Sequence, residues 1–347
     1  MTVKQEDYLL IRAAFKQAVE RTPVWVMRQA GRYLPEYLEV RKKAGSLLNL
    51  FTNPELAAEV SIQPLDLMEV DAVIMFSDIL TPLMGMGIGL DFAPGPVIKN
   101  PVRSEGDIQN LLIPDPDELT PYVGKILSIL KKELSNRAPI IGFAGAPFTL
   151  ASYLIEGGSS KLFHRLTQFF LESPTLAHKL MAKLTKMTIS YLNYQIENGA
   201  QMVQLFDTWA GIFSEDDFKE FIFPYVRQIF SELTGKGKVP GVYYVNGGCH
   251  LLNSMSNIGA DVIGLDWRAD IGEVRKQIGD KVALQGNLDP NVLFCQPEVI
   301  KQRVQSILSK YGPESGHIFN LGHGIDKEVN PEHLLFMVRT VKELSVR

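Results

Sequence analysis

The chain contains 347 residues, of which 46% are hydrophobic, and its formal net charge at pH 7 is −4. This length suits one barrel of alternating strands and helices with insertions, or two smaller domains. The apolar runs are too short to span a bilayer, which argues against an integral membrane protein. The negative charge argues against a nucleic-acid-binding protein. Any anion site must therefore be a local group of basic side chains within an acidic protein.

Two cysteines, Cys249 and Cys295, stand far apart and form no Cys-x-x-Cys pattern. A disulfide framework is not expected, and a reducing compartment fits this composition. Residues 1–7 show neither the apolar core of a signal peptide nor the Arg/Ser-rich character of a transit peptide. The sequence predicts a cytoplasmic protein, or one of the plastid stroma from which a transit segment has been removed.

Short apolar runs recur along the chain, each ending at a glycine or a polar cluster. In chain order they are Val24–Met27, Ala72–Phe76, Pro139–Phe143, Met202–Phe206, Gly241–Val245, Asp261–Leu265, Val282–Leu284 and His317–Leu321. Continuous runs of this kind are typical of parallel strands that are covered on both faces.

The segments between these runs carry signals for helices. Thr52-Asn53-Pro54-Glu55 combines a capping residue, an early proline and an acid, which is typical of a helix start. Ser214 followed by three acids, and Asn330 followed by a proline, predict two further starts. A long amphipathic helix is expected over 175–198, and Gly157-Gly158 predicts the end of a shorter helix.

Eight apolar runs that alternate with helices predict a single (β/α)8 barrel spanning residues 1–347. A doubly wound open sheet is the alternative fold. Such a sheet usually carries a Gly-x-Gly-x-x-Gly turn after its first strand, and this chain has none.

In such barrels the active site lies at the carboxyl ends of the strands, so the residues that follow each run are the candidates for function. The first run ends at Arg28-Gln29-Ala30-Gly31-Arg32. Later runs lead to a carboxylate at Asp78, a hydroxyl at Thr208 and an imidazole at His323 between two glycines. Tyr153 lies in the helical segment after the third run.

The guanidinium fork of arginine suits carboxylate or phosphate. Because no Gly-x-x-x-x-Gly-Lys-Ser/Thr phosphate loop is present, a carboxylate ligand is favoured. Each residue alone also has a structural interpretation: Arg28 as a surface ion pair, Asp78 as the cap of the next turn, and Tyr153 as packing. Asp207, Asp266 and Asp289 could simply pair with the arginines. The functional interpretation depends on the joint occurrence of these residues at successive strand ends.

A zinc site would need Cys or His ligands at close spacing. Cys249 and His250 are adjacent, but no second ligand follows them, and His323 has no His or Cys near it in the sequence. The spacing also indicates no Ser or Cys nucleophile with a paired base. The sequence therefore predicts no metal ligands.

Several long segments, in this order, resemble the motifs of the uroporphyrinogen decarboxylase family. They are Met27–Glu36, Phe76–Leu80, Gly142–Leu150, Leu205–Gly211, Gly264–Trp267, Leu284–Pro290 and Asn320–Gly324. The resemblance extends over essentially the whole length of the chain, and several long motifs in the right order make it highly specific. Thr208 stands where the family also uses Ser, and it keeps the hydroxyl.

The resemblance implies a distorted barrel that forms a homodimer and uses no metal and no organic cofactor. The substrate would be uroporphyrinogen, a cyclic tetrapyrrole with four acetate and four propionate groups. Its acetates would lose CO2 and become methyls, giving coproporphyrinogen in haem and chlorophyll biosynthesis. Carried over to this sequence, the substrate-binding residues would be Arg28, Gln29, Ala30, Gly31, Arg32, Asp78, Tyr153, Thr208 and His323.

Roles can be expected for some of these residues. Asp78 would stabilise positive charge on a pyrrole ring and accept hydrogen bonds from its N–H groups. Arg28 would orient the reacting carboxylate or take part in proton transfer, and Arg32 would bind a carboxylate. Arg41 is an additional candidate for either task.

Two other functions stay open at this point. A corrinoid-related methyltransferase can share the same barrel, but it would need a zinc-binding set of His and Cys. A non-catalytic tetrapyrrole-binding protein would keep the arginines without needing Asp78. Neither nucleic acid nor membrane is expected as a partner.

Overall fold

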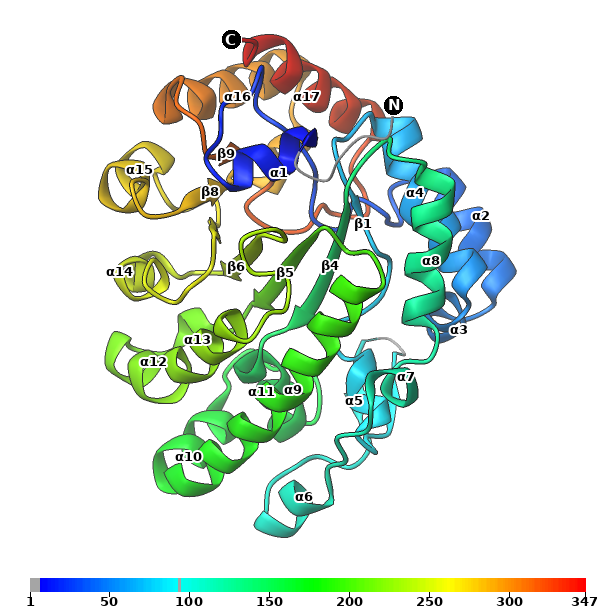
Figure 1. The fold of residues 1–347 in the computed structure, drawn as a ribbon, viewed down its shortest axis with the longest axis vertical. Coiled ribbons are helices and arrows are strands. Elements are labelled where there is room, and N and C mark those ends of the chain that lie inside the picture. The colour runs from blue at the N-terminus through cyan, green and yellow to red at the C-terminus, as the bar shows by residue number, and fades with distance from the viewer. Residues whose placement is uncertain (1–6, 93–94) are drawn as a thin grey trace.

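The computed structural model describes residues 7–92 and 95–347, and its main sheet is parallel and curls around a central axis (Figure 1). Within the described residues this sheet has seven strands. In spatial order they are β1 (Val73–Ile74), β4 (Ile140–Gly145), β5 (Met202–Asp207), β6 (Gly241–Val245), β7 (Val262–Gly264), β8 (Ala283–Gln285) and β9 (His317–Ile318). These strands match the predicted runs from the second to the eighth, so the barrel-like α/β fold is confirmed.

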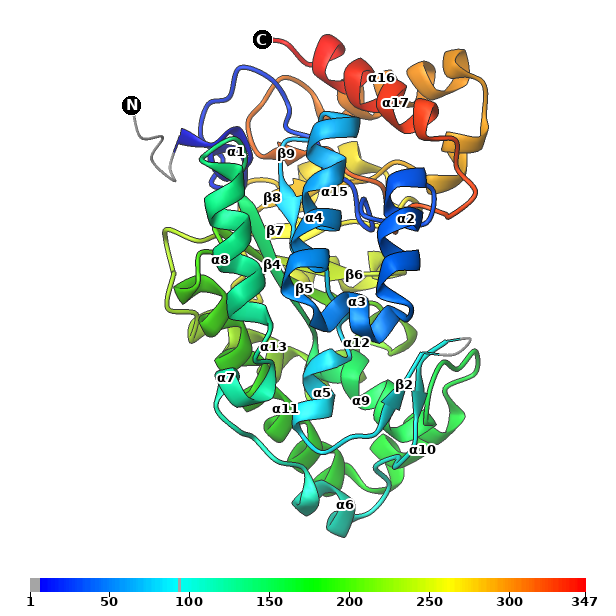
Figure 2. The ribbon, with the colours of Figure 1, turned by 90° about the vertical axis from the view of Figure 1, so that its right-hand side faces the viewer.

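Helices surround the sheet, as two views at right angles show (Figures 1 and 2). The α-helices are α1 (Leu9–Ala14), α2 (Pro35–Ala44), α3 (Leu47–Thr52), α4 (Pro54–Met68), α5 (Thr81–Gly85), α6 (Glu105–Asn110), α7 (Pro116–Leu119), α8 (Val123–Leu134), α9 (Pro147–Glu156), α10 (His164–Glu172), α11 (Pro174–Glu197), α12 (Glu215–Phe221), α13 (Phe223–Ser231), α14 (Leu252–Met255), α15 (Ile271–Ile278), α16 (Pro297–Tyr311) and α17 (Pro331–Leu344). Shorter 3₁₀ turns are η2 (Ala210–Ile212), η3 (Cys249–Leu251) and η4 (Pro290–Phe294).

The predicted helix signals are confirmed. Asn53, Ser214 and Asn330 each cap the start of a helix with a side-chain oxygen that accepts a backbone N–H. Gly157 ends α9 in the left-handed conformation, which a residue without a Cβ adopts at low cost. A small antiparallel hairpin, β2 (Leu90–Asp91) with β3 (Val97–Ile98), lies outside the barrel sheet and near α9 (Figure 2).

The first predicted run, 24–27, differs from the expectation. It forms one parallel bridge, between Val24 and Phe319, and no regular strand. The amides of its last two residues donate to side-chain oxygens instead, those of Gln29 (3.1 Å) and Asn320 (3.0 Å). The prediction of a full strand here is therefore wrong, because side chains replace the neighbouring backbone as acceptors.

This run nevertheless connects the two edges of the sheet. The Trp25 N–H donates to the Phe319 carbonyl (3.3 Å), and the Asp71 N–H, just before β1, donates to the Val24 carbonyl (2.8 Å). The Asp71 carboxylate accepts the Val24 N–H (2.8 Å) and both terminal nitrogens of Arg21 (2.6 and 2.7 Å). The Asp71 carboxylate therefore reinforces the backbone hydrogen bonds that close the barrel.

Side chains fill the interior of the barrel. A polar layer crosses it, in which the Trp25 indole donates to Gln285 (3.0 Å) and Gln285 donates to Gln204 (2.9 Å). Gln204 in turn donates to the sulfur of Met27 (3.7 Å). Because these buried polar groups bond to one another, the layer is stable without water. Below it α1 contacts β8 and β9.

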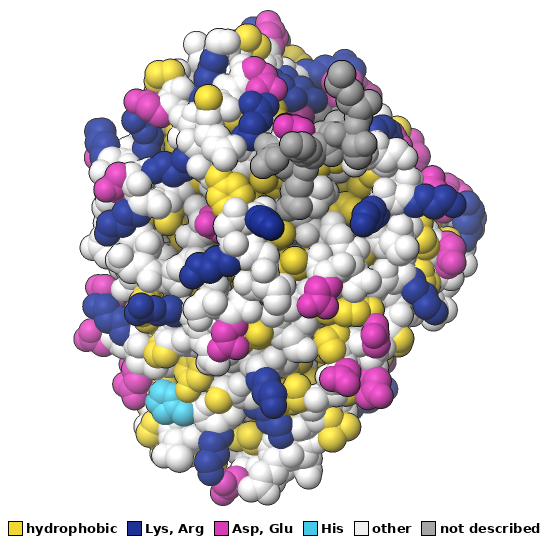
Figure 3. Space-filling view, viewed as in Figure 1, with side chains coloured by type: hydrophobic (Ala, Val, Ile, Leu, Met, Phe, Trp, Pro, Cys, Tyr) yellow, Lys and Arg dark blue, Asp and Glu magenta, His cyan; other side chains and the backbone are white. Residues whose placement is uncertain are grey.

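One face of the molecule shows how its charged side chains are distributed. On the face shown in Figure 3, acidic and basic side chains are interspersed. That face therefore has no extended basic patch of the kind that nucleic-acid-binding proteins use. No helix within residues 7–92 and 95–347 combines the length and apolar character that crossing a membrane requires.

We predict that Asp71→Ala lowers the free energy of unfolding by about 2–4 kcal/mol, because it leaves the buried Val24 N–H without an acceptor and the Arg21 guanidinium with only the Thr22 carbonyl. Urea denaturation followed by circular dichroism measures this change. Asp66→Ala is the control: it removes an exposed ion pair with Arg137, worth at most about 1 kcal/mol. Equal losses in the two variants would contradict the role of Asp71 in closing the barrel.

Candidate active site

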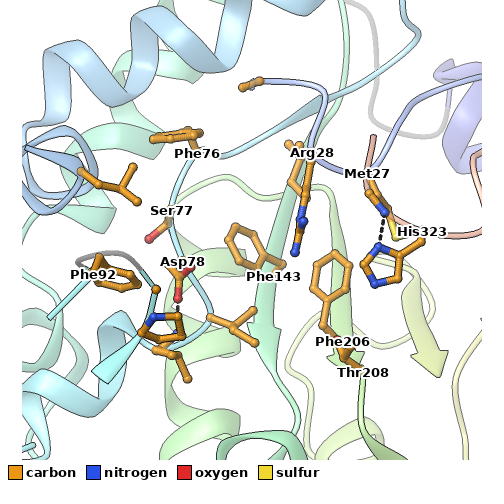
Figure 4. A pocket seen from close by; sticks show the side chains of 18 of the residues that line it. Met27, Arg28, Phe76, Ser77, Asp78, Phe92, Phe143, Phe206, Thr208 and His323 are labelled. Atoms are coloured by element: carbon orange, nitrogen blue, oxygen red, sulfur yellow. Dashed lines mark hydrogen bonds between the residues drawn. The ribbon is translucent and has the colours of Figure 1, made fainter. Parts of the chain in front are cut away.

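A cavity of about 530 Å³ opens at the carboxyl ends of the strands, where the sequence places its candidate residues (Figure 4). The predicted residues that line it are Arg28, Ala30, Arg32, Asp78, Tyr153, Thr208 and His323. They come from segments up to 295 positions apart, between 28 and 323, and the closed barrel brings them to one place.

Arg28 enters the cavity from the loop after the first run. Its φ of +63° lies in the left-handed region, which a non-glycine residue rarely adopts. The side chain lies across Gly324, where an added Cβ would collide with Cδ and Cγ of Arg28. In the described part of the chain, no carboxylate lies within ion-pair distance of this guanidinium, so its charge is available to a ligand.

Asp78 lies in the loop between β1 and α5. Its Oδ1 accepts the N–H of Leu80 (2.9 Å), and its backbone carbonyl accepts the N–H of Thr81 (3.2 Å). The capping role and the proposed functional role therefore coexist, since Oδ2 has no hydrogen-bond partner among the described residues. Burial raises the pKa of the Asp78 carboxyl, and the Leu80 N–H and the charge of Arg28 offset part of that rise.

Arg28 and Asp78 stand on different walls of the cavity, and in the view of Figure 4 Phe143 lies between them. Phe76 and Phe206 add further apolar lining. Holding a cation and an anion apart in such surroundings is unfavourable unless a ligand brings partners for both. The geometry therefore fits a ligand with hydrogen-bond donors or positive charge at its centre and carboxylates at its edge.

His323 presents a defined tautomer. Its Nδ1 accepts the N–H of Gly324 (2.8 Å), and because a backbone amide can only donate, the ring proton must be on Nε2. Burial and the nearby charge of Arg28 lower the pKa of His323 to about 4. The imidazole is therefore neutral at pH 7 and can donate one hydrogen bond to a carboxylate.

Two hydroxyl residues line the cavity together. Tyr153 projects from α9, and burial raises the pKa of its phenol, which therefore stays protonated and can donate a hydrogen bond. Thr208 follows β5 directly. Trp209, the next residue along the chain, also lines the cavity, and its ring centre is 6.4 Å from that of Tyr153. The result is a wall with two hydroxyl donors and a flat apolar surface.

The structure does not bring every candidate to the cavity. Gln29 is buried and its amide donates to the Ala72 carbonyl (3.0 Å), so it supports the loop from behind. At Gly31 an added Cβ would lie 2.9 Å from the Arg28 carbonyl, so this position keeps the turn compact. Arg41 lies on α2, is absent from the cavity lining, and lowers the pKa of its neighbour Tyr37, which burial raises overall.

The cavity also contains residues that the sequence analysis missed. Phe143, Phe206 and Tyr244 line it from within β4, β5 and β6. All three belong to the apolar runs themselves, not to the polar residues that follow the runs. Alternation of inward- and outward-facing positions at the carboxyl ends of strands is the signal that could have identified them.

Cys249 and His250, the pair considered for zinc, do not form a metal site with other residues of the described chain. His250 forms a hydrogen bond with the carbonyl of Phe213 (2.8 Å), and Cys249 beside it is exposed. Within residues 7–92 and 95–347, no three side chains of His, Cys, Asp or Glu lie together in a way that could hold a metal ion.

Solved structures share this fold at low sequence identity. A methyltransferase from Methanosarcina mazei aligns with a TM-score of 0.83 and 20% identity, covering 98% of each chain. A putative vitamin-B12-independent methionine synthase from Listeria monocytogenes aligns with a TM-score of 0.58 and 12% identity, covering 94% of this chain and 97% of its own. At such identities the likeness establishes the architecture alone.

Sequence comparisons are far closer. The family model described as uroporphyrinogen decarboxylase (URO-D) matches residues 5–344. A uroporphyrinogen decarboxylase from Neisseria meningitidis is 50% identical over 99% of this chain and 98% of its own length. One from Methylococcus capsulatus is 48% identical over 97% and 98%. The chain therefore belongs to the uroporphyrinogen decarboxylase family.

Proposed function

We propose that this protein decarboxylates the four acetate side chains of uroporphyrinogen III, giving coproporphyrinogen III and four CO2 in porphyrin biosynthesis. Family membership over nearly the whole chain supports this function. The observation that carries it is the cavity in which Arg28 and Asp78 face a common space without pairing. A macrocycle with pyrrole N–H groups at its centre and carboxylates at its edge supplies partners for both.

Loss of CO2 requires an acceptor for the electrons of the breaking C–C bond. A pyrrole ring protonated on carbon can take them, so the substrate provides its own electron sink. The ring carbon takes up one proton before CO2 leaves and gives it up afterwards. The methylene carbon gains a second proton and becomes a methyl, so each CO2 released corresponds to a net uptake of one proton. Asp78 would stabilise the cationic ring and accept its N–H groups.

Arg28 is better suited to binding than to acid catalysis, because the guanidinium group holds its proton at neutral pH. We assign it to the reacting carboxylate, with the proton supplied through water. Arg32 is exposed at the rim and would bind a peripheral carboxylate, while Tyr153, Thr208 and His323 would donate hydrogen bonds to others.

Two properties complete the proposal. We expect a homodimer, as the family resemblance implies, and sedimentation analysis would test it. We also propose a cytoplasmic location, because the similar relatives named above are bacterial. The plastid alternative gains no support from them.

Incubation of the purified protein with uroporphyrinogen under reducing conditions, followed by product separation, tests the function. We expect coproporphyrinogen and four CO2 per macrocycle. Bound but unchanged octacarboxylate would indicate the non-catalytic binding protein instead. Metal analysis of the same sample separates the methyltransferase alternative, which would need stoichiometric zinc.

We predict that Asp78→Asn lowers kcat by about 10²–10³-fold, since the substitution removes the charge and keeps the shape. Binding of the substrate should persist, because Arg28 and Arg32 are unchanged. Steady-state kinetics and equilibrium binding measure the two effects. A wild-type kcat in this variant would exclude Asp78 as the stabilising group.

We predict that Gly324→Ala lowers kcat/KM by about 10²-fold, because the new methyl group displaces the Arg28 side chain from its place in the cavity. The melting temperature should change little, since a flexible side chain can move away. Gly106→Ala on exposed α6, where an added Cβ meets nothing closer than 3.8 Å, is the control and should behave as wild type. Unchanged activity in Gly324→Ala would show that the position of Arg28 is not critical.

A further inference from the structure

Asp207 is a buried carboxylate that the mechanism above does not use. It ends β5, has no measurable exposure, and immediately precedes Thr208 and Trp209 of the cavity wall. Among the described residues no cation pairs with it, and burial raises the pKa of its carboxyl to about 6. The expectation that it pairs with an arginine is therefore wrong, and a group that is costly to bury in this way needs another explanation.

All the hydrogen bonds of this group are donated in the direction of the Asp207 carboxylate. The Trp209 N–H donates to the Thr149 hydroxyl (3.2 Å), and that hydroxyl donates its single proton to Oδ1 of Asp207 (2.8 Å). Oδ2 accepts the hydroxyl of Tyr243 (2.8 Å). The Asp207 carboxylate, ionised at pH 7, can only accept, so both hydroxyls donate to it, and the Trp209 N–H uses a lone pair of the Thr149 hydroxyl.

These hydrogen bonds fix the backbone of the cavity wall from one side. From the other side Gly211 packs so closely on the loop after β6 that an added Cβ would collide with the Asn246 carbonyl. The Trp209 ring then packs against Phe163 (4.8 Å between centroids) and Tyr153 (6.4 Å). Thr208 thus lies in the segment that Asp207 holds, and Tyr153 on α9 meets that segment at the Trp209 ring.

We propose that Asp207 is a positioning residue for the decarboxylation. Through Thr149 it holds the Thr208–Trp209 turn, and this turn presents the hydroxyl wall that orients each acetate of the macrocycle toward Arg28 and Asp78. The inference rests on the proposed function, since it concerns whether the macrocycle loses all four acetate carboxyls before it leaves the site. A poorly held wall would bind partly decarboxylated porphyrinogens less firmly, so they would dissociate before the last step.

Three isosteric or near-isosteric variants test this. Thr149→Val breaks the link between Asp207 and the wall, whereas Tyr243→Phe removes an equivalent hydrogen bond to the same carboxylate on the side away from Trp209. Thr149→Ser retains the hydroxyl. The measurements are kcat and the ratio of partly decarboxylated porphyrinogens to coproporphyrinogen released. The ratio is taken at equal, low conversion with uroporphyrinogen in excess, so that released intermediates do not rebind. Unfolded molecules form no product, so under these conditions the ratio does not depend on the folded fraction.

We expect Thr149→Val to lower kcat about tenfold or more and to raise the ratio of intermediates. Tyr243→Phe should keep the wild-type ratio, and Thr149→Ser should restore it. If Thr149→Val does not fold, Thr149→Cys, whose thiol is a weak donor and acceptor, should change both quantities in the same direction to a smaller extent.

A wild-type ratio and kcat in the Thr149 variant, or equal changes in Tyr243→Phe, would overturn the positioning role while leaving the proposed function intact. A wild-type protein that leaves uroporphyrinogen unchanged would overturn the proposed function, and this inference with it.

Discussion

Two opposite charges that do not meet determine how this site works. Arg28 and Asp78 face the same largely apolar cavity, and among the described residues no ion pair joins them. Had they been close enough to pair, each would have satisfied the other and neither would have been available to a ligand. Kept apart, they favour a molecule with anionic edges and a centre that donates hydrogen bonds and becomes cationic during the reaction.

Several independent contacts and backbone features of the fold keep the two side chains apart. Asp71 connects the first run to the edge of the sheet, which places Arg28 opposite β1 and its following loop. The left-handed backbone of Arg28 and the missing side chain at Gly324 direct the guanidinium inward. The turn at Asp78 is held by the Leu80 N–H. Because these contacts and features lie in different segments, the site depends on the complete closure of the barrel.

Much of this could be predicted from the sequence, and the exceptions have physical causes. Continuous apolar runs identify parallel strands well, since burial on both faces demands them. The run at 24–27 looks the same, but whether its amides bond to a neighbouring strand or to the side chains of Gln29 and Asn320 depends on tertiary contacts. Likewise the sequence shows that Arg41 is basic and nearby, yet only the direction of α2 places it outside the cavity.

The central claim, that Asp78 is a half-buried carboxylate under the influence of an unpaired Arg28, can be measured directly. Aspartate labelled with carbon-13 at the carboxyl group would allow Asp78 to be titrated by NMR in the wild type and in Arg28→Met. We predict a pKa above the ordinary aspartate value in the wild type, because burial outweighs the Leu80 hydrogen bond and the arginine charge. Removing that charge should raise the pKa of Asp78 further. An ordinary or lowered pKa, or one unchanged by Arg28→Met, would contradict the claim.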